Sequence, residues 1–107
     1  MLLEIWKKEH KFLNADSSTH IMSKEIGLPV HHVTYFFNQI SNEKYIYWRN
    51  RLRVEYAIDL INRQEEYNKT IEVLSKECGF KSYSAFFQSF KQITGKLPKD
   101  YIRDIKS

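Results

Sequence analysis

Residues 74–90 read LSKECGFKSYSAFFQSF, and their first six residues nearly repeat MSKEIG at residues 22–27. In both copies Ser-Lys-Glu precedes a glycine, Gly27 or Gly79, and an amphipathic segment lies on each side of that glycine. A glycine in a turn permits a positive φ without steric cost. The chain therefore contains a helix–turn–helix pattern twice, which predicts two similar units of two helices each.

Helical periodicity continues on both sides of the two copies. The three glycines and two prolines of the chain fall between the periodic segments or at their starts. No Asn-Gly or Asp-Gly hairpin signal occurs. The sequence thus predicts an all-α fold of about seven helices, at residues 2–13, 19–26, 30–40, 44–64, 70–78, 83–93 and 98–105.

The 107 residues are expected to form one domain with two subdomains. The fourth predicted helix is the longest, and at about 1.5 Å per residue it is roughly 30 Å long. Major grooves on one face of B-DNA recur every ~34 Å. We therefore expect one helix–turn–helix subdomain at residues 1–43, a linker helix at 44–66 and a second such subdomain at 67–107.

Charge and composition restrict the classes of partner. The net charge is +4, and residues 67–107 account for it, with eight Lys or Arg against four acidic residues. Such a basic segment suits a polyanionic partner. The single cysteine, Cys78, cannot form an internal disulfide and is expected in the core, in a reducing compartment. No apolar run reaches ~18 residues, so no membrane contact by this segment is expected.

The aromatic residues are expected to build the core. One face of the first predicted helix contains Leu2, Ile5, Trp6, Glu9 and Leu13, so it is apolar except for one charge. This pattern favours a core helix over the alternative of a membrane-surface helix. The neighbours of Trp6, Trp48 and Tyr101 also repeat at helical spacing. This spacing favours core packing over the alternative role as platforms for single-stranded bases.

Two segments, RVEYAIDLI and TIEVLSKECGFKSYSAFFQSFKQITGKLPKDYI, resemble the carboxy-terminal domain of the AraC/XylS family of bacterial transcription regulators. The matching positions are Arg53, Ala57, Leu60, Ile61, Gly79, Phe80, Phe86, Phe90, Lys91, Gly95, Pro98 and Tyr101. The resemblance implies a tandem helix–turn–helix domain that binds double-stranded DNA sequence-specifically and regulates transcription in the bacterial cytoplasm. It also implies a sensor or receiver domain elsewhere in a longer parent chain.

A few positions depart from the pattern of that family. Ser23 and Ser75 stand where alanine is usual, Arg49 stands where an aliphatic residue is usual, and Ile102 follows the final tyrosine where an arginine is common. The linker helix is therefore expected to pack differently around Arg49. Whether Arg53 pairs with a carboxylate or contacts the DNA backbone is left open by the sequence.

The resemblance implies that the third and sixth helices enter the major groove and read bases. Its base-facing positions are His31, Thr34 and Tyr35 in the first unit, and Tyr83, Ser84 and Gln88 in the second. Helical spacing places Asn38 on the same face as the first three. Neither helix carries an arginine, and bidentate arginine is the commonest reader of guanine. A preference for A·T-rich half-sites is therefore predicted.

Backbone contacts are expected from lysines around the second unit. The predicted phosphate-binding residues are Lys76, Lys81, Ser82 and Lys91, and Lys69, Lys96 and Lys99 lie nearby in the sequence. Phosphate contacts fix the register of a protein on DNA without specifying a sequence. We expect the second unit to supply most of the salt-dependent affinity and the first to contribute mainly selectivity.

Other functions fit the sequence less well. The main alternative is a helical protein-interaction module that docks on RNA polymerase, which would show little salt-dependent retention on DNA. The sequence has no nucleophile–base arrangement and no phosphate-binding glycine loop, so no enzyme and no catalytic residue is predicted. His31 and His32 are adjacent and point about 100° apart on a helix, so neither a metal nor a cofactor is expected.

Overall fold

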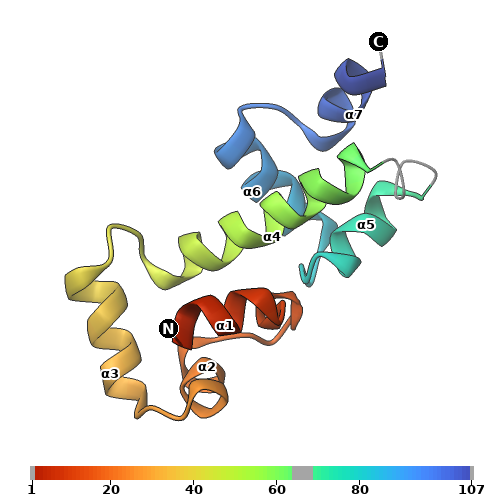
Figure 1. Ribbon diagram of the computed structural model, residues 1–107. Helices are drawn as coiled ribbons and strands as arrows, with labels where there is room; N and C mark the ends of the chain where they lie inside the picture. Colours follow the sequence, from red (N-terminus) through yellow and green to blue (C-terminus); the bar gives the residue numbers. More distant parts are fainter. Residues whose placement is uncertain (1, 64–68, 107) are drawn as a thin grey trace.

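The computed structural model describes residues 2–63 and 69–106, and the regular structure in this part of the chain is entirely helical (Figure 1). It confirms the predicted all-α fold of about seven helices. The elements are α1 (Leu2–Lys8), a 3₁₀ turn η1 (Lys11–Leu13), α2 (Thr19–Ile26), α3 (Val30–Tyr35), a π-helical turn η2 (Phe36–Ile40), α4 (Tyr45–Asn62), α5 (Ile71–Glu77), α6 (Tyr83–Thr94) and α7 (Pro98–Lys106).

Helix α4 is shared by two hydrophobic cores. It crosses the molecule diagonally, with α1, α2 and α3 near its beginning and α5, α6 and α7 near its end (Figure 1). Its first half contributes Tyr45, Trp48 and Leu52 to one core. Its second half contributes Val54, Ala57, Leu60 and Ile61 to the other. The molecule is accordingly elongated, with principal extents of 46 × 24 × 22 Å.

Aromatic rings fill the first core, as the sequence predicts. Trp6 and Trp48 are buried and stacked, with ring centroids 5.4 Å apart. The Trp6 indole also donates a hydrogen bond of 2.9 Å to Glu25. Tyr101 is half-buried against the second core, where its ring lies 5.4 Å from that of Phe90. Cys78 is fully buried in that core.

The predicted single helix at residues 2–13 is wrong in one respect, because the chain reverses at His10. This residue has φ 56° and ψ 37°, in the left-handed region, so α1 ends before it and η1 follows. The His10 ring packs edge-on against Phe12 and Tyr56, which favours the reversal. The predicted core face is right for Trp6 and Leu13, which pack in or against the first core, and wrong for Leu2 and Ile5, which are exposed by 45% and 52%.

The third predicted helix changes its winding at its midpoint. Residues up to Tyr35 are α-helical, and the π turn begins at Phe36, whose carbonyl accepts a hydrogen bond of 2.8 Å from the Ser41 amide. The wider turn buries Phe37 in the first core. Residue 64, the predicted end of the fourth helix, and the subdomain boundary predicted at residues 66 and 67 lie outside the described residues.

None of the described helices combines the length and the apolar composition that crossing a membrane requires.

Candidate nucleic-acid interface

The two repeated turns share one closing hydrogen bond and a glycine of positive φ, although α3 begins three residues after Gly27 and α6 four residues after Gly79. Gly27 and Gly79 both have positive φ values, 75° and 92°. In each copy the residue after the glycine donates its amide to the carbonyl of the repeated serine. The two hydrogen bonds are 3.0 Å from Leu28 to Ser23 and 3.1 Å from Phe80 to Ser75. This six-residue closure ends one helix and directs the chain into the next.

The repeated serines are buried residues of the first helix of each unit, α2 and α5. Ser23 and Ser75 are buried, with 6% and 1% of their surface exposed. Each hydroxyl donates to a backbone carbonyl three residues earlier, that of His20 at 2.6 Å and that of Glu72 at 2.7 Å. The polar atom is thereby satisfied inside its own helix, so serine can occupy a position where little space is left for a side chain.

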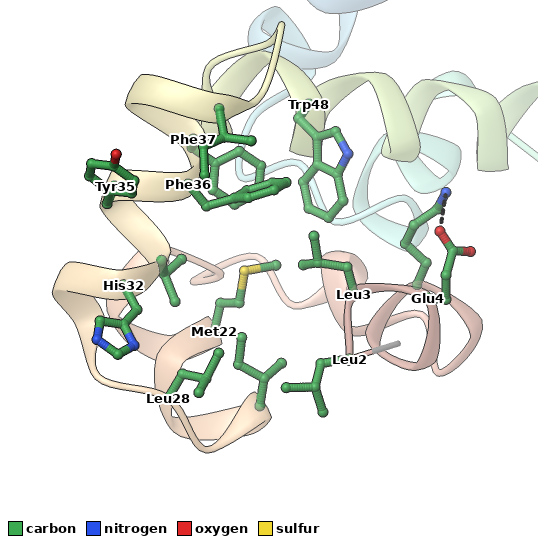
Figure 2. A pocket seen from close by; sticks show the side chains of 14 residues that line it. Leu2, Leu3, Glu4, Met22, Leu28, His32, Tyr35, Phe36, Phe37 and Trp48 are labelled. Atoms are coloured by element: carbon green, nitrogen blue, oxygen red, sulfur yellow. Dashed lines mark ion pairs between the residues drawn. The ribbon is translucent and has the colours of Figure 1, made fainter.

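In the first unit α3 presents an outer face opposite the core. Val33 and Phe37 are buried, whereas His31 is exposed and Tyr35 is 60% exposed. Figure 2 shows Phe37 turned toward Trp48 and Tyr35 on the opposite side of the helix. Thr34 is half-buried, and its hydroxyl donates to the His31 carbonyl at 3.2 Å. Of the three predicted base readers on α3, His31 and Tyr35 are the more accessible.

Asn38 lies on a flank of this outer face. It is exposed and lines a shallow hollow together with Thr19, Lys44 and Ile46, at the starts of α2 and α4. The opposite flank of α3 borders an apolar groove of about 730 Å³, which Leu2, Met22 and Leu28 line from α1, α2 and the first turn (Figure 2). The predicted reading face of the first unit is therefore bordered by a shallow hollow at Asn38 and by an apolar groove.

In the second unit α6 presents a similar outer face. Phe86 and Phe90 are fully buried, and Ser84 and Gln88 are exposed. Tyr83 is 40% exposed, and its ring packs edge-on against the half-buried Phe87 with centroids 5.9 Å apart. Sequence reasoning did not include Phe87, although the spacing of four residues from Tyr83 is a signal for such a pair.

The predicted phosphate-binding residues have different surroundings. Lys76 and Lys91 are exposed. The Ser82 hydroxyl accepts a hydrogen bond of 3.1 Å from the Ala85 amide and so caps α6. The Lys81 amine lies 3.0 Å from an Asp16 carboxylate oxygen across the two units. Ser82 is thus already engaged in helix capping, whereas Lys81 can exchange one exposed anion for another.

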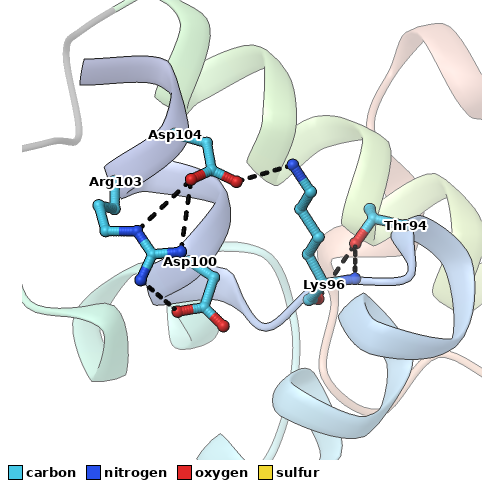
Figure 3. A network of polar contacts seen from close by, with 5 residues as sticks. All are labelled: Thr94, Lys96, Asp100, Arg103 and Asp104. Atoms are coloured by element: carbon cyan, nitrogen blue, oxygen red, sulfur yellow. Dashed lines mark hydrogen bonds and ion pairs between the residues drawn. The ribbon is translucent and has the colours of Figure 1, made fainter. Parts of the chain in front are cut away.

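Two other lysines of the second unit are paired with carboxylates. Lys69 contacts Glu77, and Lys96 contacts Asp104, each at 2.8 Å. Figure 3 shows Lys96 at the turn before α7, where Arg103 also approaches Asp104. The hydrogen bond from Lys96 lowers the pKa of Asp104 below its ordinary value. These exposed pairs stabilise the fold little, but they reduce the positive field that the charge count suggests.

Three His, Cys, Asp or Glu side chains arranged as metal ligands are not found within residues 2–63 and 69–106. The rings of His31 and His32 pack edge-on, 4.6 Å apart.

Comparison with known proteins identifies the repeated units. A family model described as "Helix-turn-helix domain" matches residues 22–104. Among curated proteins, no sequence matches the chain.

Three solved structures share the fold. The C-terminal domain of AraT, a response regulator from Geobacillus stearothermophilus, is 16% identical with a TM-score of 0.78, and the match covers 96% of this chain and 84% of that one. The DNA-binding domain of AdpA, a global transcriptional factor in complex with a target DNA, is 18% identical with a TM-score of 0.79, covering 98% and 92%. A Listeria innocua protein of unknown function is 20% identical with a TM-score of 0.78, covering 94% and 91%.

Proposed function

The chain belongs to the AraC-type helix-turn-helix family of DNA-binding domains, and from that premise we propose that it regulates transcription by placing α3 and α6 in two successive major grooves. The observation that carries this proposal is the pair of exposed helix faces, each following a turn whose glycine has a positive φ. The principal extent of 46 Å is large enough for two such helices to reach grooves that recur every ~34 Å. The AdpA domain with the same fold was solved on its target DNA.

We assign base reading to residues of the two outer faces, all of them exposed except the half-buried Thr34. The set is His31, Thr34, Tyr35 and Asn38 in the first unit and Tyr83, Ser84 and Gln88 in the second. Glutamine and asparagine match the hydrogen-bonding edge of adenine, and methyl or aromatic groups contact the thymine methyl. Tyr83 and Phe87 together offer an apolar surface at the start of α6, where recognition helices usually contact bases.

Selection of bound sequences from a random DNA pool tests this function directly. We expect the recovered sites to contain two A·T-rich half-sites about one helical turn apart, because neither α3 nor α6 carries an arginine to read guanine. The measurement is the enrichment of each base at each position.

A matched pair of variants tests the role of Gln88. Gln88→Ala should relax the selection at one position of one half-site, while Gln92→Ala, one turn further along the exposed side of α6, should leave it unchanged. Recovery of G-rich sites by the wild-type chain would contradict the predicted base preference.

Salt dependence tests the assignment of the backbone contacts. Lys76→Ala or Lys91→Ala is expected to reduce the slope of log affinity against log salt by about 1, because each removes one phosphate contact. Lys24→Ala removes an equal charge from the last turn of α2 and should change the slope less. Equal changes in all three variants would contradict the proposal that the second unit supplies most of the salt-dependent affinity.

The wider setting follows from the same premise. We place the protein in the bacterial cytoplasm, in a longer parent chain with a sensor or receiver domain, and with RNA polymerase as a second partner. The AraT domain of the same fold is the C-terminal domain of a response regulator, which supports such a parent chain. An interaction module without DNA readout is the alternative, and failure of the chain to show salt-dependent retention on duplex DNA would favour it.

A further inference from the structure

A hollow of about 430 Å³, lined by both polar and apolar side chains, lies between the two helix–turn–helix units. Three parts of the chain supply its lining. Among the lining residues are Ser17 and Ser18 before α2, Arg49 and Arg53 on α4, and Phe80 and Lys81 before α6. The hollow therefore joins the first unit, the linker helix and the second unit at one place.

Two guanidinium groups in this hollow contact only neutral acceptors. Arg49 donates to the Ser17 carbonyl at 2.8 Å and to the side-chain oxygen of Asn50 at 3.1 Å. Arg53 donates to the carbonyls of Phe12 and Asn14 at 2.7 and 2.8 Å. In the part of the chain that the structure describes, neither guanidinium forms an ion pair with a carboxylate.

The charge of Arg49 acts on the neighbouring Arg53 in this hollow. Burial lowers the pKa of Arg49, and burial together with the charge of Arg49 lowers the pKa of Arg53 to about 10. Both groups still carry a proton at neutral pH. A third cation, Lys81, lines the hollow, and Asp16 is the one carboxylate among its lining residues. Lys81 and Asp16 are 69% and 73% exposed, so water already screens their contact strongly.

The position of the hollow relates it to both reading helices. Ala85, from the first turn of α6, belongs to its lining. The shallow hollow that Asn38 lines on the flank of α3 shares Ser17, Ser18 and Arg49 with it. The two adjoining hollows together thus extend from the flank of α3 to the start of α6. A duplex that contacts α3 and α6 in successive grooves must pass its sugar–phosphate backbone across this region.

We propose that the hollow binds one phosphodiester of the DNA backbone between the two major grooves, with Arg49 as its main ligand. This inference rests on the proposed function and adds a contact at the centre of the site. A DNA phosphate would give Arg49 and Arg53 the anionic partner that they lack among the described residues. It can also replace Asp16 as the partner of Lys81. Charge-assisted contacts between guanidinium and phosphate are stronger than those that Arg49 makes to neutral acceptors.

The test combines a protein variant with a modified DNA. Single phosphates between the two half-sites of a selected duplex are replaced, one at a time, by uncharged methylphosphonate, and affinity is measured for wild type and Arg49→Leu. We expect one replacement to weaken wild-type binding about fivefold to tenfold, and Arg49→Leu to weaken binding by a similar factor. The two changes together should weaken it no more than either alone, because both remove the same contact.

Arg51→Leu is the matched control. It removes the same charge from the same helix, but Arg51 is already paired with Glu43 and Glu55, each at 2.8 Å. The fold-change in affinity caused by Arg51→Leu should therefore multiply with the fold-change caused by each methylphosphonate replacement. Thermal unfolding verifies that each variant is folded, and Arg49→Gln, which also lacks the charge, replaces Arg49→Leu if the leucine variant is not.

The possible outcomes separate a failure of the phosphate-site inference from a failure of the proposed DNA-binding function. Multiplying effects for Arg49→Leu at every central phosphate would overturn the inference while leaving DNA binding intact. If the wild-type chain bound no duplex in a salt-dependent manner, both the inference and the proposed DNA-binding function would be overturned. A rise in the melting temperature with inorganic phosphate that Arg49→Leu abolishes, together with multiplying effects on DNA, would identify a free-anion site and also overturn the inference.

Discussion

Replacing Arg53 by methionine is expected to lower the free energy of unfolding by about 2–4 kcal/mol. The Arg53 side chain is 98% buried, with 2% of its surface exposed, and it donates hydrogen bonds to the carbonyls of Phe12 and Asn14. Its guanidinium also lies 5.5 Å from the centre of the Phe80 ring. Methionine fills much of the same space but leaves the Phe12 carbonyl without its donor. The loss per unsatisfied buried group is about 1–3 kcal/mol.

Chemical denaturation measures this loss, and two further variants make it specific. Arg63→Met removes the arginine that directly follows α4, which is 59% exposed and paired with Asp59. It should lower the free energy of unfolding by less than about 1 kcal/mol. Arg53→Lys keeps the charge but replaces the planar guanidinium, which contacts both carbonyls, by a single ammonium group. It should therefore restore only part of the stability. Full stability of Arg53→Met would show that these hydrogen bonds do not stabilise the packing of α4 against the segment that contains Phe12 and Asn14.

Replacing Gly79 by alanine is expected to lower the free energy of unfolding by about 2–5 kcal/mol. The residue has φ 92°, a conformation that costs an L-residue about 1–2 kcal/mol. A Cβ atom there would also lie 2.7 Å from the Leu13 carbonyl oxygen and 2.9 Å from the Arg53 Nε atom. Relieving such a contact with backbone requires one unit to move away from the other, which adds about 1–3 kcal/mol.

Gly95 is a suitable control because it shares the backbone conformation without the contact. Its φ is 80°, and a Cβ atom would meet nothing within 4 Å. Gly95→Ala should therefore lower the free energy of unfolding only by the cost of the left-handed backbone conformation, about 1–2 kcal/mol. The difference between the two variants in chemical denaturation isolates the contact with Leu13. Equal losses would mean that the close approach of the two units at Gly79 adds nothing to stability.

The sequence predicted those elements whose signals are local. Helix α2 has the predicted bounds because Ser18 accepts from the Ile21 amide at its start and Gly27 ends it in the left-handed conformation. The burial of Phe86 and Phe90 and the exposure of Gln88 follow from helical periodicity alone. The two glycine turns and the two amphipathic helix faces can therefore be predicted from the sequence alone.

Features that depend on distant contacts could not be predicted. His10 adopts a left-handed conformation through ring contacts that include Tyr56, 46 positions further along the chain. The role of Arg53 depends on carbonyls 41 and 39 residues away in sequence. The pairing of Lys81 with Asp16 likewise joins the two units. Of the candidate site, the exposure of the outer faces could be predicted, whereas the central hollow could not.

The contact of Gly79 with the Leu13 backbone has a consequence for the DNA that the chain recognises. Because the two units meet there and share α4, the protein has little freedom to follow a change in the distance between half-sites. One inserted base pair would rotate the second half-site by about 35° around the duplex axis. A genome search for regulated promoters can therefore keep the spacer length constant and let only the bases of the half-sites vary.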